Sequence, residues 1–197
     1  MQSLFISKQK PEDYVDGDGA GEYPAAPRKC PFKDCGVNLE MKKNGYYKRS
    51  LYTISFTGRI RVRRYKCPKC KRTLSMLPSF CLARYSYGVE FITSLLRQVL
   101  RIGSIKKAVA EWHTQEAGVS RRLIGKYLAR VRKNRRMIQY GINQLSPGNI
   151  SLGRIPGDTE WTKRFLDGIR PSLSPEFNAK FHKTTGTSFM SSHNRIA

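Results

Sequence analysis

Two pairs of closely spaced cysteines are the residues of this sequence best suited to chemistry. Cys30 and Cys35 form a C-x4-C pair, and Cys67 and Cys70 form a C-x2-C pair. Each spacing fits a tight turn that points two thiolates at one ion, and tetrahedral Zn²⁺ is the ion that four thiolates favour. Four protein ligands leave no position for water or substrate, so the spacing predicts one structural Zn(II) per chain.

Three other uses of these cysteines have to be weighed. Two disulfides require an oxidising compartment, whereas the N-terminus has no signal-peptide pattern, and we expect a cytoplasmic protein. A ribbon without metal, held by packing alone, is a second alternative. Redox chemistry by the C-x2-C pair is a third, but no thioredoxin-like strand and helix surround it. The fifth cysteine, Cys81, lies between Phe80 and Leu82, so we expect a small buried side chain rather than a ligand.

The residues between the two cysteine pairs predict a β-hairpin that brings the pairs together. Residues 46–56 are rich in β-forming side chains, Thr57-Gly58 marks a turn, and residues 59–65 alternate with period two. Ile60 and Val62 are expected to face the core. The opposite face of that strand would carry three arginines that either contact phosphates or form an ordinary solvated face: Arg59, Arg61 and Arg63.

Beyond residue 87 the apolar period becomes helical and predicts a three-helix unit. The three apolar stripes are Ile92, Leu95, Leu96 and Val99; Ile105, Ala108, Val109 and Trp112; and Ile124, Tyr127, Leu128 and Val131. Ser104 and Ser120 stand at N-cap positions, preceded by Gly103 and Gly118 as helix terminators. The short connection at residues 114–120 predicts that the second and third helices form a helix-turn-helix.

The third predicted helix is strongly basic away from its apolar stripe. In a helix-turn-helix the second helix enters the major groove, where arginine can bind guanine O6 and N7. We therefore expect Arg121 and Arg122 to contact bases. Other cations of this helix are expected to contact phosphates: Lys126, Arg130, Arg132 and Lys133. Gly125 costs about 1 kcal/mol inside a helix, which close approach to DNA or close helix packing would explain. A plain basic three-helix bundle is the alternative.

Charge supports a polyanionic partner. The chain has 37 Lys and Arg against 14 Asp and Glu, and residues 27–148 carry the whole net charge of +23. So many positive charges repel one another in the folded protein unless a polyanion screens them. This favours nucleic acid as the partner over an anionic membrane, and over a basic surface that only keeps the protein soluble. No apolar stretch reaches the ~20 residues needed to span a bilayer, so we expect no membrane partner.

These observations predict an α+β fold in four segments. Residues 1–27 form a flexible acidic leader, and residues 28–82 a four-cysteine zinc ribbon built on the hairpin. Residues 87–145 form the helix-turn-helix unit. Residues 146–197 form a loop-rich tail with one short helix, at about residues 158–167, and a frayed end.

No set of residues predicts catalysis, so we expect a protein that is not an enzyme. A two-metal nuclease core needs three carboxylates on an RNase H-like fold, and the acidic residues outside the leader lie on no convincing buried strand. The Gly-Thr-rich stretch at residues 183–188 lacks the Gly-Lys pair of a phosphate loop. No Ser–His–Asp set stands out.

Residues 30–85 resemble an uncharacterised bacterial family that pairs a zinc ribbon with a helix-turn-helix and looks transposase-related. The matching positions are Gly45-Tyr46, Arg49, Arg63, the Cys67–Cys70 pair, Thr73, Leu77-Pro78 and Tyr85. Lys71 replaces the Gly usual in such knuckles, and Ala83-Arg84 replaces Pro-Tyr. More loosely, the chain resembles the N-terminal DNA-binding regions of insertion-sequence transposases. The resemblance implies DNA binding connected with mobile elements and supplies no catalytic residues.

The leading hypothesis is a sequence-directed double-stranded DNA-binding protein, either a transposition accessory protein or a regulator. Its partners would be duplex DNA and either a transposase or a second copy of the chain in a homodimer. An RNA-binding or ribosome-associated zinc ribbon is the alternative, because Tyr46, Tyr47, Tyr52 and Tyr65 could stack on unpaired bases. An adaptor in a nucleoprotein assembly is a third hypothesis.

Overall fold

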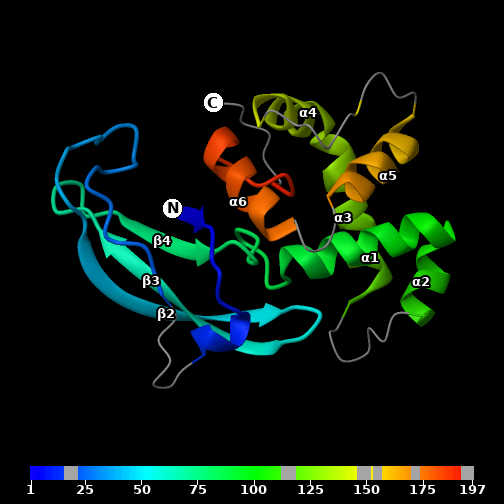
Figure 1. Cartoon of the computed structure of the whole chain (residues 1–197), viewed down its shortest axis with the longest axis horizontal. Coiled ribbons are helices and arrows are strands. Elements are labelled where there is room, and N and C mark those ends of the chain that lie inside the picture. Colours follow the sequence, from blue (N-terminus) through cyan, green and yellow to red (C-terminus); the bar gives the residue numbers. More distant parts are fainter. Residues whose placement is uncertain (16–21, 112–118, 146–151, 153–156, 170–173, 192–197) are drawn as a thin grey trace.

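The chain folds into a mixed α+β structure with a sheet on one side and a group of helices on the other (Figure 1). The computed structural model describes residues 1–15, 22–111, 119–145, 152, 157–169 and 174–191. In these ranges it has four strands, paired in the order β1-β4-β3-β2, and six α-helices. The strands are β1 (Gln2–Phe5), β2 (Lys42–Tyr52), β3 (Thr57–Lys66) and β4 (Thr73–Pro78).

The predicted hairpin is present, with its turn in a different place. β2 and β3 pair antiparallel, and Ile60 and Val62 are fully buried as expected. The predicted turn at Thr57-Gly58 is wrong, because β3 begins at Thr57. The chain turns instead at residues 53–56, where the Thr53 amide donates to the Phe56 carbonyl (2.7 Å) and the Phe56 amide to the Thr53 hydroxyl (2.9 Å). These two hydrogen bonds outweigh the turn preference of the Thr-Gly pair.

The prediction of a flexible leader is wrong for the described part of residues 1–27. β1 pairs parallel with β4 and forms one edge of the sheet. A short 3-10 helix, η1 (Pro11–Tyr14), then buries Tyr14, whose ring packs edge-on against Tyr23 and Phe80. Apolar and aromatic burial therefore fixes a segment whose acidic composition suggested mobility.

The described part of residues 87–145 contains four helices where the sequence predicted three. They are α1 (Val89–Ile102), α2 (Ile105–Glu111), α3 (Arg121–Lys133) and α4 (Arg135–Gln144). Gly103 ends α1 with a left-handed φ of 72°, and the Ser120 hydroxyl accepts from the Leu123 amide (3.2 Å) as an N-cap. The buried Asn134 separates α3 from α4, because its side-chain amide donates to the carbonyls of Phe189 and Ser191. The proposed turn at residues 114–120 lies outside the described residues except for its last two positions.

The C-terminal segment is a structural part of the helical core, and the prediction of one helix there is wrong. It holds α5 (Asp158–Gly168) and α6 (Ser174–Thr185). Trp161, Phe165, Phe181 and Phe189 pack together and are at most 1% exposed. The Asn178 amide also donates to the carbonyls of Ser79 (2.9 Å) and Cys81 (2.8 Å), so α6 joins the sheet to the helices.

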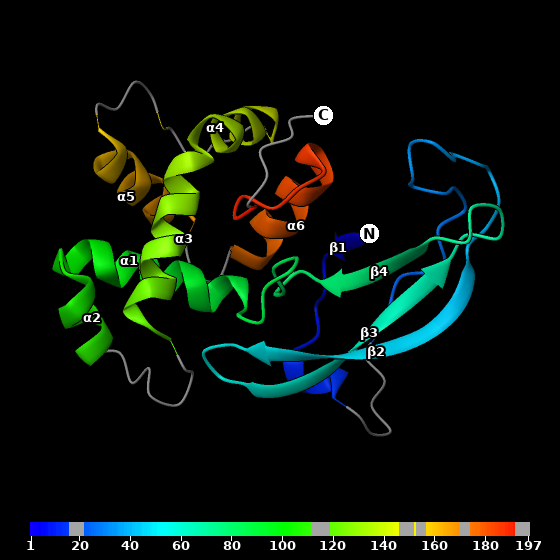
Figure 2. The ribbon, with the colours of Figure 1, turned by 180° about the vertical axis from the view of Figure 1, so that it is seen from behind.

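The two views in Figures 1 and 2 place α6 between the sheet and the other helices, while the loops that carry the cysteine pairs lie at the far end of the sheet. Among the described residues, no helix is long and apolar enough to cross a membrane.

Candidate metal centre and nucleic-acid interface

The four predicted cysteine ligands come together at one end of the sheet. The Sγ atoms of Cys30 and Cys70 are 3.8 Å apart, and those of Cys35 and Cys67 are 3.9 Å apart. All four sulfur atoms lie within 4.8 Å of one another, and Cys30 and Cys67 are buried. This cluster can hold one metal ion. Cys81 is fully buried in the apolar core outside the cluster, as predicted, and burial raises the pKa of its thiol to about 12.

Backbone hydrogen bonds shape the first cysteine pair into a knuckle. The amides of Cys35 and Gly36 both donate to the Phe32 carbonyl (2.9 Å each), and the Cys30 amide donates to the Val37 carbonyl (3.0 Å). Gly36 has a φ of 49°, a conformation that glycine adopts without strain. The two thiols of this pair therefore point to the same side of the turn.

The second pair has a similar knuckle with a lysine at its left-handed position. The Lys71 amide donates to the Cys67 carbonyl, and the Cys67 amide to the Arg72 carbonyl, both at 3.0 Å. Lys71 has a φ of 61°, in the region that costs a side-chain-bearing residue roughly 1–2 kcal/mol. This conformation explains physically why glycine is usual at that position of such knuckles.

Arg72 connects the two knuckles. Its guanidinium group lies 4.2 Å from the centroid of the Phe32 ring and 2.6 Å from a carboxylate oxygen of Asp34. A hydrogen bond from Arg72 lowers the pKa of Cys70 to about 6, whereas burial raises the pKa of Cys30 to about 12. Of these two thiols, Cys70 is therefore the one that loses its proton more readily at neutral pH.

The cations predicted to contact DNA from α3 separate into two groups. Ile124, Tyr127, Leu128 and Val131 are buried, as the apolar stripe predicted. The opposite face is exposed and carries four cations: Arg121, Arg122, Lys126 and Lys133. A Cβ added at Gly125 would meet no atom within 4 Å, so close helix packing does not explain this glycine.

Arg130 and Arg132 contact the protein itself. Arg130 lies over the Tyr85 ring and donates to the Tyr85 hydroxyl. Arg132 donates to the Thr159 hydroxyl of α5 (3.2 Å) and its Nε is buried. Both side chains are half-buried. The structure therefore places them apart from the four exposed cations of the same helix.

The three arginines of β3 share one face of the sheet, with an aromatic ring among them. Arg59 is exposed. The guanidinium groups of Arg61 and Arg63 lie 4.3 and 4.5 Å from the centroid of the Tyr46 ring, and Tyr46 is the cross-strand partner of Arg63. Cation–π contacts thus hold two of the three guanidinium groups in a fixed place on the strand.

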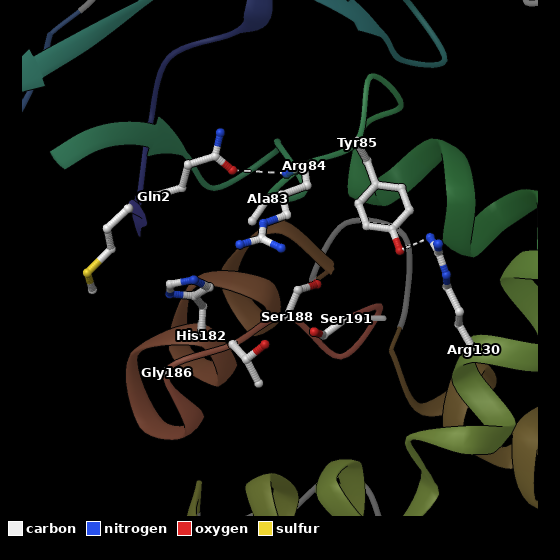
Figure 3. A pocket seen from close by; sticks show the side chains of 11 residues that line it. Gln2, Ala83, Arg84, Tyr85, Arg130, His182, Gly186, Ser188 and Ser191 are labelled. Atoms are coloured by element: carbon white, nitrogen blue, oxygen red, sulfur yellow. Dashed lines mark hydrogen bonds between the residues drawn. The ribbon is translucent and has the colours of Figure 1, made fainter. Parts of the chain in front are cut away.

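A cavity of about 610 Å³ between the sheet and the helices was not predicted from the sequence (Figure 3). Its lining comes from segments far apart in the chain, among them Gln2, Arg84, Arg130, His182 and Ser188. No local motif joins these positions. The one sequence signal was Ala83-Arg84, the dipeptide that departs from the expected Pro-Tyr.

Residues 30–117 match a family described as a domain of unknown function (DUF6431). The matched stretch begins at the first cysteine and extends beyond α2, so it includes both knuckles, three of the four strands and the first two helices. No curated protein and no solved structure matches the chain.

Proposed function

We propose that this chain is a zinc-stabilised protein that binds double-stranded DNA through α3. The observation that carries the proposal is the two-sided character of this helix. One side is buried in the core, while Arg121, Arg122 and Lys126 are exposed on the other, beside a glycine that leaves open space. A helix with these properties can approach the floor of the major groove closely.

The neighbourhood of α3 supports a helix-turn-helix. α2 packs against α3, and Ser120 caps the first turn of α3, where a recognition helix contacts base edges. Arg121 and Arg122 lie in that first turn. In the proposed complex they read bases, and Lys126 and Lys133 contact phosphates.

Zinc is the metal that we propose for the cysteine cluster. An ion with four sulfur ligands at about 2.3 Å in a tetrahedron holds the sulfur atoms about 3.8 Å apart. The Cys30–Cys70 and Cys35–Cys67 separations of 3.8 and 3.9 Å agree with that geometry. With four protein ligands the ion would be structural. It would fix the end of the sheet that carries Arg63 and Tyr65.

The alternative hypothesis of RNA binding has less support than binding to duplex DNA. Tyr65 is 3% exposed and donates to the Pro24 carbonyl (2.6 Å). Tyr46 is covered by two guanidinium groups, and Tyr52 packs against Tyr87 with ring centroids 5.3 Å apart. Rings engaged in this way are poor platforms for unpaired bases. An accessory or regulatory role in transposition, without catalysis by this chain, remains our proposal from the resemblance.

Fluorescence anisotropy with matched duplex DNA, duplex RNA and single-stranded DNA tests the proposal. We expect the duplex DNA to bind most tightly at physiological salt, with a steep loss of affinity as salt rises. The double variant Arg121→Ala/Arg122→Ala should lose most of this preference. Lys163→Ala/Arg164→Ala removes two exposed cations from α5 and is the matched control. Equal losses in both variants would show that net charge alone drives binding and would contradict the proposal.

A further inference from the structure

The cavity beside α6 combines cationic and hydroxyl groups around one space. Ala83, Arg84 and Tyr85, which follow β4, form one wall, and Arg130 of α3 lies beside them. His182 of α6 also lines the cavity, and the turn after it adds three hydroxyl-bearing residues: Thr187, Ser188 and Ser191. None of the described residues that line the cavity carries a carboxylate. The electrostatic balance of the space is therefore positive and rich in hydrogen-bond donors.

Arg84 extends its guanidinium group into this space, toward the imidazole ring of His182 (Figure 3). The backbone of Arg84 has a φ of 68°, a left-handed conformation that a side-chain-bearing residue rarely adopts. The Arg84 amide is fixed by a hydrogen bond to the Gln2 side-chain oxygen (3.0 Å), and the Tyr85 amide donates to the Leu82 carbonyl (3.2 Å). These contacts hold a strained position whose effect is to aim a cation into the cavity.

His182 and Ser188 add donors at the opposite side. His182 is 7% exposed, and burial lowers its pKa, so the ring is neutral at pH 7 and offers one N–H donor. Ser188 is buried, and its hydroxyl oxygen accepts from the Met190 amide (3.2 Å), so its hydroxyl hydrogen remains available for donation to another acceptor. Guanidinium, imidazole and hydroxyl donors around a space without carboxylates suit an anion with several oxygen acceptors.

We propose that this cavity binds a phosphate group, with Arg84 as its main ligand and with Arg130, His182 and Ser188 completing the donor set. Arginine presents a planar pair of N–H donors that matches two phosphate oxygens. The volume of about 610 Å³ exceeds the needs of one phosphate and can accommodate an attached nucleoside. The ligand is therefore a phosphate monoester, either a free nucleotide or the phosphorylated end of a nucleic acid strand.

This site is separate from the exposed face of α3. Arg130 lies on the inward side of that helix, whereas Arg121, Arg122 and Lys126 are exposed. The phosphate site goes beyond the proposed duplex binding, and either can fail without the other. Occupation would also join the segment after β4 to α3 and α6, and should raise the thermal stability of the protein.

Isothermal titration calorimetry on the whole 197-residue chain, loaded with metal, tests the site, with inorganic phosphate and AMP as probes. Ionic strength is held constant with chloride, because a net charge of +23 attracts anions everywhere. The test variant is Arg84→Gly, which removes the cation and accepts the left-handed backbone without strain, so it should remain folded. The control is Arg101→Ala, which removes one exposed cation from the last turn of α1.

We expect one site per chain, with affinity weakened about tenfold or more in Arg84→Gly and changed less than about twofold in Arg101→Ala. The imidazole resonances of His182, identified in NMR spectra by their absence from His182→Gln, should shift on titration. Equal weakening in both variants, or no Arg84-dependent binding of either probe, would overturn the proposal.

Oligonucleotides identify the source of the phosphate. One strand is prepared with a 5′-phosphate and the same strand with a 5′-hydroxyl, and both are titrated into wild type and Arg84→Gly. A preference for the phosphorylated strand that disappears in Arg84→Gly assigns the site to a nucleic acid end. Equal binding of the two strands, together with Arg84-dependent binding of AMP, assigns it to a free nucleotide.

Discussion

The guanidinium group of Arg130 lies 5.2 Å from the centroid of the Tyr85 ring and donates a hydrogen bond to the Tyr85 hydroxyl. That hydroxyl in turn donates to the Met190 carbonyl. The chain of contacts joins α3, the segment after β4 and the turn after α6. One cation of α3 is thus part of the tertiary structure, while Lys126, one turn earlier, is exposed.

This difference predicts opposite effects for two alanine substitutions on the same helix. Arg130→Ala should lower stability by about 1–2 kcal/mol, because it removes a charge-assisted hydrogen bond and a cation–π contact. Its affinity for a duplex with 5′-hydroxyl ends should change less than about twofold. Lys126→Ala should leave stability within about 0.5 kcal/mol and reduce the salt dependence of duplex binding by about one unit of slope. Chemical denaturation and anisotropy measure the two quantities, and the reverse pattern would contradict the proposed division of α3.

The cysteine cluster predicts one metal ion per chain. Native mass spectrometry and elemental analysis should find one zinc in the wild type and none after all four cysteines are replaced by serine. Cys81→Ala should keep the ion, because Cys81 lies outside the cluster. Acidification should release the metal, since protons compete for the thiolates. A fully metallated quadruple variant would exclude this site.

Gly125→Ala should have opposite effects on the stability of the fold and on the affinity for duplex DNA. Alanine favours a helix interior by about 1 kcal/mol over glycine, and the added methyl group meets no atom within 4 Å, so the protein should become more stable. The same methyl group should weaken duplex binding if DNA approaches this face closely. Gly141→Ala is the matched control, because its Cβ would lie 2.3 Å from the Phe181 ring and should destabilise the fold. Gly125→Ala with unchanged affinity would argue against close approach at Gly125.

His182 predicts a loss of stability on acidification. Burial lowers its pKa in the folded protein, so below its ordinary value of about 6.5 the unfolded chain binds the proton more readily. Stability that is present at pH 7.5 should therefore decline as the pH falls through 6.5, by at most ~1.4 kcal/mol per pH unit for one proton. Denaturation of wild type and His182→Gln between pH 7.5 and 5.5 measures this, and the variant should show the smaller slope. Identical slopes would show that the pKa of His182 is the same in the folded and unfolded chain.

Short-range patterns were sufficient to predict the local elements. Cysteine spacing predicted the cluster of four cysteines, and the alternation around Ile60 and Val62 predicted the buried side of β3. The caps at Gly103 and Ser120 were confirmed because each acts within its own turn. The separation of the four cysteines in sequence also required the hairpin that brings them together.

Contacts between distant segments could not be predicted in this way. β1 is only four residues long, and it is fixed by pairing with β4, about seventy positions later. Asn134 breaks the basic run after α3 because its side chain binds carbonyls near residue 190. α6 was not predicted, although Phe177 and Phe181 have helical spacing. Glycine, proline and polar residues on either side of them indicated loops.

Enrichment of binding sites from a random-duplex pool at physiological salt is the most direct test of sequence recognition by α3. It is performed with wild type, with Arg121→Ala/Arg122→Ala and with the control Lys163→Ala/Arg164→Ala. We predict that wild type and control recover the same motif, that the α3 double variant recovers none, and that any half-site spacing reveals pairing of the protein. Binding without a motif, or a motif that survives loss of both α3 arginines, would contradict sequence recognition by α3.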